Sequence, residues 1–415
     1  MRKALWLCGA AAVFIATPTL AQTTPAPAPA PSADAAQQGV LVFDPAFFAE
    51  SRPDTVLDML SRLPGFNLES GDNDTRGYAG AGGNVLVDGQ RPAIKSEGLD
   101  QYLRRISAAS VERIELIRGG APGIDMQGRS VIANIIVRRT VTTQRVIEFN
   151  PYFYPDGYIG PLVRASYSRR EGQSQEEIAF RATSDRRVDL VGDGFRRRYN
   201  ANGALIQDAR LDLDDLFRNV NLAGAVQRPV NGGLLRVNGL LNYDMGRIGQ
   251  TLTVVAGAGQ NERSQQETEG LDGEVGLRWT RALSDRTELE LTGLQRLSTG
   301  DFTAPFTRGG FNSVFTSDET AGESIARGLT RFRPNDRWAF EGGGEVAYNF
   351  LDGATTYAEN GVAIALPSAS VKVEELRGEI FGQTTWRPSP RLTLEGGLRV
   401  EVSEISQSGD IDRSK

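Results

Sequence analysis

The stretch VERIELIRGGAPGIDMQGRSVIANIIVRR, residues 111–139, predicts two strands joined by a glycine turn and an irregular loop. Arg118 stands directly before Gly119 and Gly120, so the first strand ends on an arginine. From about residue 144 to residue 415 the chain alternates apolar and polar segments. The sequence therefore places a compact strand pair directly ahead of a long region of a different kind.

Residues 40–140 predict a small α/β unit around this pair. A helix begins near Asp54, the predicted N-cap, and stops at Pro64-Gly65. The other predicted elements are a strand in VLVFD (40–44), a strand in NVLVDGQ that ends in the Asp88-Gly89 turn, and a short helix in LDQYLRRI (99–106). The glycine-rich RGYAGAGG at 76–83 is followed by a strand, so it offers no helix N-terminus to a phosphate and is not a nucleotide loop.

The N-terminus predicts export. Residues 1–21 combine Arg2 and Lys3, an apolar run, and a small-residue end, which is the pattern of a signal peptide. Residues 22–39 are rich in Pro and Ala and predict a semi-rigid linker.

The composition excludes much enzyme chemistry. The chain has no His, and its single cysteine, Cys8, lies in the predicted signal peptide. Cys and His nucleophiles, Ser-His-Asp triads and Cys/His zinc sites are therefore excluded. We expect no catalytic residue, metal or cofactor, and the spread net charge of -6 gives no sign of a nucleic-acid partner.

Residues 141–415 have period-two patterning. In LDGEVGLRWT, Leu271, Val275 and Leu277 fall on one face and Glu274 and Arg278 on the other. Short polar turns at 170–173, 229–232, 283–286, 333–336 and 388–391 alternate with longer connections that we expect to be irregular. This asymmetry predicts a membrane β-barrel with short periplasmic turns, because a sandwich would bury the charged rows at a large cost.

About 11 strands can be placed in this region. They are 144–153, 158–169, 173–184, 211–228, 233–246, 268–282, 287–298, 319–332, 338–351, 371–387 and 391–404. The last of them runs outward, like the first, which would leave an open edge in lipid. We therefore expect a partial transmembrane barrel.

The order of motifs at 40–140 resembles that of TonB-dependent outer-membrane receptors. The resemblance is carried by a helix ending in LPGF, then RGY, NVLVDGQRP, VERIELIRGGAPG and VIANIIVRR. The loop IDMQGRS departs from the family pattern, although Asn134 stands in the matching place. The resemblance implies an N-terminal plug domain inside a barrel of about 22 strands, of which about 11 are present.

The same resemblance implies a function and partners. It implies active import of a scarce nutrient, such as a ferric siderophore or other small ligand, across the outer membrane of a Gram-negative bacterium. The partners would be the TonB energy-transducing complex, and outer-membrane lipid and lipopolysaccharide. The Arg196 to Arg198 triplet has two readings, a solvated loop or lipopolysaccharide contact and an anionic-ligand contact.

Candidate site residues follow from the resemblance. Arg76 and Arg118 correspond to plug arginines that pair with barrel carboxylates, and they are the predicted plug–barrel lock. Inward carboxylates that could pair with them are Glu341, Glu345, Glu395 and Glu401. Tyr78, Gly80, Gly82 and Gly83 form either a substrate-facing plug apex or a merely exposed loop. Val40, Leu41, Val42 and Phe43 are either the segment that contacts TonB by strand pairing or the first plug strand.

Three other functions compete with import. A passive or secretion-type pore would lack the plug that residues 54–139 predict. An enzyme would need a paired carboxylate arrangement, and none is legible. A signalling receptor would need a folded domain ahead of the plug, for which the Pro/Ala-rich segment is too short. The substrate cannot be identified from the sequence.

Overall fold

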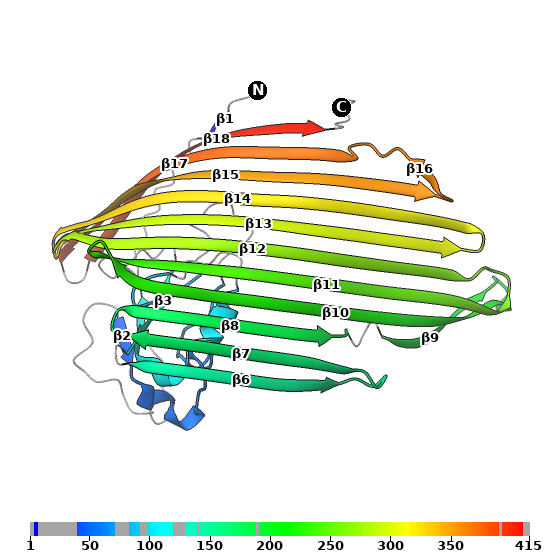
Figure 1. The fold of residues 1–415 in the computed structure, drawn as a ribbon, viewed down its shortest axis with the longest axis horizontal. Helices are drawn as coiled ribbons and strands as arrows, with labels where there is room; N and C mark the ends of the chain where they lie inside the picture. The colour runs from blue at the N-terminus through cyan, green and yellow to red at the C-terminus, as the bar shows by residue number, and fades with distance from the viewer. Residues whose placement is uncertain are drawn as a thin grey trace.

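The computed structural model describes residues 4–6, 40–70, 83–91, 98–118, 129–138, 141–187, 191–389 and 392–409. Within them lie two sheets, one of four strands and one of fourteen. We call the small sheet and its helices, residues 40–138, the plug, and the long antiparallel sheet the wall. Figure 1 shows the plug at the left end of the wall, where the short turns lie. Arg76, Tyr78, Gly80 and Gly82 lie outside the described residues.

The wall confirms all eleven predicted strands. They are β6 (Thr142–Phe153), β7 (Ile159–Glu171), β8 (Ser174–Asp185), β10 (Leu205–Val230), β11 (Gly233–Gly257), β12 (Glu262–Ser284), β13 (Thr287–Arg308), β14 (Phe311–Asn335), β15 (Trp338–Glu359), β17 (Ser370–Ser389) and β18 (Leu392–Gly409). Each pairs antiparallel with the next one in this series (Figure 1).

Three short strands complete the wall. β9 (Gly192–Tyr199) pairs with β10, and β16 (Val362–Ile364) pairs with β15. β1 (Ala4–Trp6) pairs with β18. β1 falls within the predicted signal peptide, whose removal stays a prediction.

The expectation of long irregular connections is wrong for part of the wall. β13 and β14 run on to a hairpin at Gly309-Gly310, with register pairs unbroken from Thr287 with Phe332 to Arg308 with Phe311. The residues beyond the predicted strand ends continue the ladder because each finds a backbone partner on its neighbour. In FTAPFTR, residues 302–308, Phe302, Ala304 and Phe306 still stand at every second position, so the period of two extends beyond the predicted end of β13.

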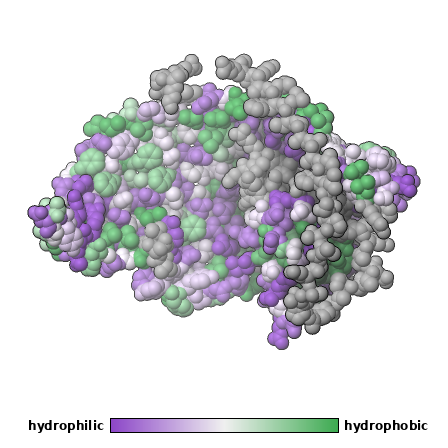
Figure 2. Space-filling view, turned by 180° about the vertical axis from the view of Figure 1, so that it is seen from behind, coloured by the Kyte–Doolittle hydropathy of each residue, from purple (hydrophilic) through white to green (hydrophobic). Residues whose placement is uncertain are grey.

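The two faces of the wall have inverted polarity. On β12, Glu274 and Arg278 are only 2% and 3% exposed, whereas Val275 on the opposite face is 57% exposed. Charges are thus enclosed and apolar side chains are open to the surroundings, as in a transmembrane barrel. Figure 2, seen from behind, shows hydrophilic residues across the middle of the sheet beside apolar patches.

Aromatic rings gather at the short-turn end of the wall. Trp338 and Trp386 lie opposite each other on β15 and β17 and stack with ring centroids 5.3 Å apart. Trp338 also stacks on Phe340 at 5.6 Å. Such rings are enriched at the membrane–water boundary, so they mark one edge of the apolar band.

The plug sheet has the order β2-β4-β5-β3. β4 (Val111–Arg118) and β5 (Val131–Val137) are the predicted strand pair and lie in the middle, antiparallel to each other. β2 (Val40–Phe43) pairs antiparallel with β4, and β3 (Val85–Val87) pairs parallel with β5. The nearly continuous apolar run of β5 reflects burial on both faces of the sheet.

Short helices cover the plug sheet. They are η2 (Pro45–Ser51), α1 (Val56–Leu60), α2 (Leu99–Arg104) and η3 (Ala108–Ser110). The predicted N-cap, Asp54, is wrong by one residue. Thr55 caps α1, because its hydroxyl accepts a hydrogen bond from the Asp58 backbone amide. In return, the Asp58 carboxylate accepts from the Thr55 backbone amide, and the two bonds form a capping box. Among the described residues, no helix is long and apolar enough to cross a membrane.

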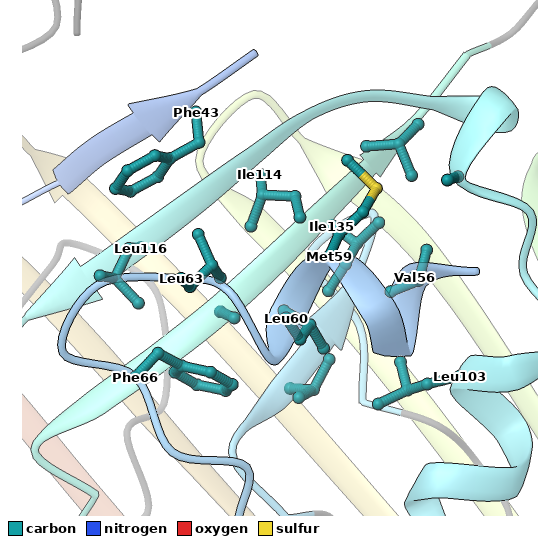
Figure 3. Close-up of a cluster of buried hydrophobic side chains, with 14 of the residues drawn as sticks. Phe43, Val56, Met59, Leu60, Leu63, Phe66, Leu103, Ile114, Leu116 and Ile135 are labelled. Atoms are coloured by element: carbon teal, nitrogen blue, oxygen red, sulfur yellow. The ribbon is translucent and has the colours of Figure 1, made fainter. Parts of the chain in front are cut away.

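The plug has a hydrophobic core of its own. Apolar side chains of α1 and α2 pack on the central strands (Figure 3). Met59 and Leu60 come from α1, Leu103 from α2, and Ile114 and Ile135 from β4 and β5, all almost fully buried. The plug is therefore held together by its own apolar burial.

We expect Val346→Arg to impair insertion of the wall, because Val346 is 56% exposed on the apolar face. Arginine facing lipid costs about 2–4 kcal/mol at the bilayer midplane. Asn349→Arg on the enclosed face is the control, since Asn349 there donates to Glu375. The measurement is the heat-modifiable gel shift of protein extracted from outer membranes. Equal assembly of both variants would contradict the assignment of the two faces.

Leu60→Ala should destabilise the plug by about 2–5 kcal/mol, because it opens a cavity in a closely packed core. Leu41→Ala on the exposed edge strand is the matched control. The urea concentration at which trypsin begins to cleave the plug in outer-membrane vesicles measures the effect. A shift no larger than that of Leu41→Ala would show that this cluster does not hold the plug together.

Candidate functional site at the contact of plug and wall

The turn after β3 is the part of the plug that reaches the wall. Val87 and Gln90 exchange backbone hydrogen bonds of 2.8 and 3.0 Å around Asp88-Gly89. Asp88 has φ +51° and Gly89 has φ +79°, so both central residues are left-handed. Asp and Gly are the residues that tolerate this conformation in two-residue turns, which explains the sequence DG at this point.

Side chains fix this turn to β5. The Gly89 backbone amide donates to Asn134 Oδ1 at 2.8 Å, and the Val137 amide donates to Asp88 Oδ1 at 3.0 Å. Asn134 also donates from Nδ2 to Glu115 Oε2 at 2.9 Å, and its side chain is buried. Both halves of the Asn134 amide are therefore used, and the turn is positioned by the central strands.

Three contacts join this turn to the wall. Arg170 of β7 donates from Nη1 to Asp88 Oδ2 at 2.8 Å. Gln90 Nε2 donates to Thr280 Oγ1 of β12 at 3.4 Å. Arg278, also on β12, donates to the backbone carbonyl of Arg91. One plug turn thus contacts both β7 and β12, strands that lie far apart along the wall.

A second charged group surrounds α2. Glu177 of β8 and Arg236 of β11 form an ion pair of 2.6 Å, with both side chains nearly buried. The plug residues Tyr102 and Arg105 interact electrostatically with both, and Arg105 lies 5.4 Å from the Tyr102 ring. Burial raises the pKa of Tyr102 and lowers that of Arg105, while Glu177 opposes the second shift.

Two cavities lie along this contact. One of about 150 Å³ is lined by the Asp88 turn, Tyr102, Arg170 and Arg236. The other, of about 420 Å³, is lined by α2, the start of β6 and the β7–β8 hairpin. Charged and amide side chains line much of the smaller cavity, which suits water, whereas Val87, Ile106 and Val137 add apolar surface to the larger one.

The enclosed face of the wall carries a network of ion pairs. Arg331 on β14 reaches Glu290 at 3.2 Å and Glu341 at 3.0 Å. Glu345 on β15 reaches Arg377 on β17 at 2.8 Å and Arg327 on β14 at 3.4 Å. Each carboxylate is therefore enclosed beside at least one guanidinium group of opposite charge, which offsets part of the cost of removing it from water.

Each of the four carboxylates predicted as partners of the plug arginines interacts with an arginine of the wall. Glu341 and Glu345 belong to the network just described, and Glu401 lies 3.7 Å from Arg377. Glu395 interacts electrostatically with Arg387. Arg118 donates to the Pro64 carbonyl within the plug at 3.3 Å. The lock assigned to Arg76 and Arg118 stays a prediction.

The other predicted site residues are placed as follows. Gly83 is buried with φ +56°, and its carbonyl accepts from Arg91. Val40, Leu41, Val42 and Phe43 form β2, the edge strand of the plug sheet. Contact of this strand with TonB stays a prediction. In the arginine triplet, Arg196 pairs with Glu262 and Arg197 with Asp208, both at 3.1 Å.

Sequence reasoning missed the contacts between plug and wall. NVLVDGQ predicts only a strand and a turn, and the turn alone accounts for its Asp-Gly pair. Arg170 appears in the sequence as one member of a double arginine at 169–170. Neither residue indicates the other, because 82 residues separate them.

Residues 32–131 match the family model described as the TonB-dependent Receptor Plug Domain. These residues therefore carry a plug domain of the TonB-dependent receptors, and a long antiparallel sheet follows them in the chain. Receptors of this family are transporters, not enzymes, and lie in the outer membrane of Gram-negative bacteria. A search of curated proteins gives no match.

Several solved structures resemble the chain at low identity. The ferric yersiniabactin uptake receptor FyuA from Yersinia pestis has 10% identity and a TM-score of 0.38, with 91% of this chain and 70% of that chain covered. The siderophore receptor PiuA from Acinetobacter baumannii has 12% identity and a TM-score of 0.38, with 91% of this chain and 59% of that chain covered. The copper transporter OprC has 15% identity and a TM-score of 0.35, with 89% of this chain and 55% of that chain covered. This chain thus spans little more than half the length of the last two.

Asn134→Ala should loosen the Asp88 turn, because it leaves the Gly89 amide and the Glu115 carboxylate without this partner. Loss of a buried partner costs about 1–3 kcal/mol. Gln101→Ala on the exposed side of α2 is the control. Protection of the plug from trypsin across a urea series reports the change. If the two variants behave alike, the amide does not hold the turn.

Proposed function

We propose that this chain forms the plug and wall of an outer-membrane receptor that imports a scarce nutrient, such as a ferric siderophore, using energy from the TonB complex. A single observation carries this proposal: a plug with its own core lies against the enclosed charged face of a wall whose other face is apolar. A polar interior would conduct water and ions, and a packed insert closes it.

Energy coupling is supported by the position of β2. This strand lies at the edge of the plug sheet, and four register pairs join it to β4. It also directly follows the Pro/Ala-rich segment. An edge strand suits recognition by strand addition, in which a partner strand pairs with the open edge.

The substrate class is the finer part of the proposal. The resembling receptors carry ferric yersiniabactin, siderophores or copper in their names, and those ligands belong to those proteins. Growth of a strain that depends on this receptor, with iron supplied only as defined ferric siderophores, tests the siderophore. Growth that depends on copper and on no ferric siderophore would show that the substrate is copper. It would contradict the siderophore assignment and leave the proposal of active import in place.

Deletion of residues 40–140 from the protein as expressed from its gene should leave an open pore, because the plug occupies the interior. Single-channel conductance in planar bilayers should rise markedly over that of the intact protein. A deletion variant that assembles in the outer membrane but conducts no more than the intact protein would contradict the plug function.

Dependence on TonB separates active import from the alternative, a passive or secretion-type pore. Uptake should be lost in a strain that lacks TonB while the amount of assembled receptor stays constant. Uptake that continues unchanged without TonB would favour the passive pore.

A further inference from the structure

We propose that Asp88 of the plug and Arg170 of the wall form an anchor pair that holds the plug in its closed position. This inference rests on the proposed function, since it assigns the residues that keep the insert in place. The pair has the opposite polarity to the predicted lock: the plug supplies the carboxylate and the wall supplies the guanidinium.

The Asp88 carboxylate is divided between two tasks. Oδ1 accepts from the Val137 amide of β5, and Oδ2 accepts from Arg170 Nη1 at 2.8 Å. The backbone amide of Asp88 donates to the Ile135 carbonyl at 2.8 Å. The carboxylate is therefore oriented by the plug before it meets the wall, and little side-chain freedom remains to be lost in the contact.

Arg170 is fixed on its own side as well. Its Nη2 donates to Gln175 Oε1 at 2.8 Å across the β7–β8 hairpin, and its side chain is only 12% exposed. The neighbouring pair of Arg169 with Glu171 has side chains 49% and 59% exposed, against 12% for Arg170 and 39% for Asp88. Solvent screens the Arg169–Glu171 pair more strongly, so we expect the Asp88–Arg170 pair to contribute more to the stability of its contact.

The surroundings confine the pair further. Asp88 and Arg170 line the same cavity as Tyr102 and Arg236, and both act electrostatically on Tyr102. Arg278 holds the Arg91 carbonyl at the other end of the turn, on β12. The turn is thus bound at two separated places on the wall, which restrains rotation of the plug as well as its displacement.

Asp88→Asn and Arg170→Gln test the pair. Asparagine keeps an oxygen for the Val137 amide and tolerates the left-handed backbone, so it removes the charge and leaves the turn. Each single variant should shift the ratio of displaced to closed plug by about five- to thirtyfold, the range expected from loss of one charge-assisted contact. The readouts are entry of a large antibiotic into cells and trypsin protection of the plug in urea.

The double variant provides the decisive comparison. If the two residues act only through their mutual contact, the variant with both Asp88→Asn and Arg170→Gln should leak no more than the leakier single variant. If they act independently, the fold-increases in leak of the two single variants should multiply. Arg170→Lys should recover part of the closure, because it restores the charge. Arg169→Gln is the matched control and should not leak.

Two outcomes would overturn the inference. One is that both single variants seal and resist urea like the unaltered protein while the gel shift shows normal assembly. The other is that the double variant leaks as the product of the two singles. The deletion of residues 40–140 keeps the proposed function separate: if the deletion opens the pore and the pair variants do not, only the anchor assignment fails.

Discussion

Enclosed charge on one face of the wall is the constraint on which the rest of this structure depends. Glu345 is 5% exposed and would be unstable there without Arg327 and Arg377, so the strands that supply them must keep their register. A slip of one residue would turn the ionic row toward lipid and the apolar row inward. The β13–β14 ladder satisfies this requirement along its whole length, and the β14–β15 ladder does so from Ser313 paired with Glu359 to Phe332 paired with Phe340.

A polar interior also dictates the kind of insert that can fill it. The wall offers the plug guanidinium, carboxylate and hydroxyl groups, so the plug cannot be stabilised mainly by burying apolar surface against the wall. It keeps its apolar side chains for its own core, with Met59, Leu60 and Leu103 packed on Ile114 and Ile135. The contact with the wall is left to polar groups such as Asp88. The interactions that stabilise the fold of the plug are therefore different from those that hold the plug against the wall.

The sequence predicted local structure and failed at long-range pairing. All eleven main wall strands and the central pair β4 and β5 follow from periodicity and turns, because both act over a few residues. The N-cap moved from Asp54 to Thr55, since the capping box needs its acceptor three residues before Asp58. The Asp88 turn was predicted but its partner Arg170 was not, because that contact is set by how the plug sits against the wall. Glu341 and Glu345 were correctly placed on the enclosed face, and their arginine partners on neighbouring strands depend on a register that no single strand reveals.

The length of the wall strands has a consequence for what the cell presents to its surroundings. β13 and β14 hold 22 and 25 residues, roughly 70–80 Å of ladder at about 3.3 Å per residue, against a hydrocarbon core about 30 Å thick. Even with a tilt of about 40°, much of each strand stands clear of the membrane. The part of the wall beyond the membrane is therefore a continuous hydrogen-bonded sheet and not a set of loops. Insertions are best tolerated at the turns that join the strand tips, such as Gly309-Gly310 and Asn360-Gly361. Residues added there leave the strand register in the rest of the wall unchanged.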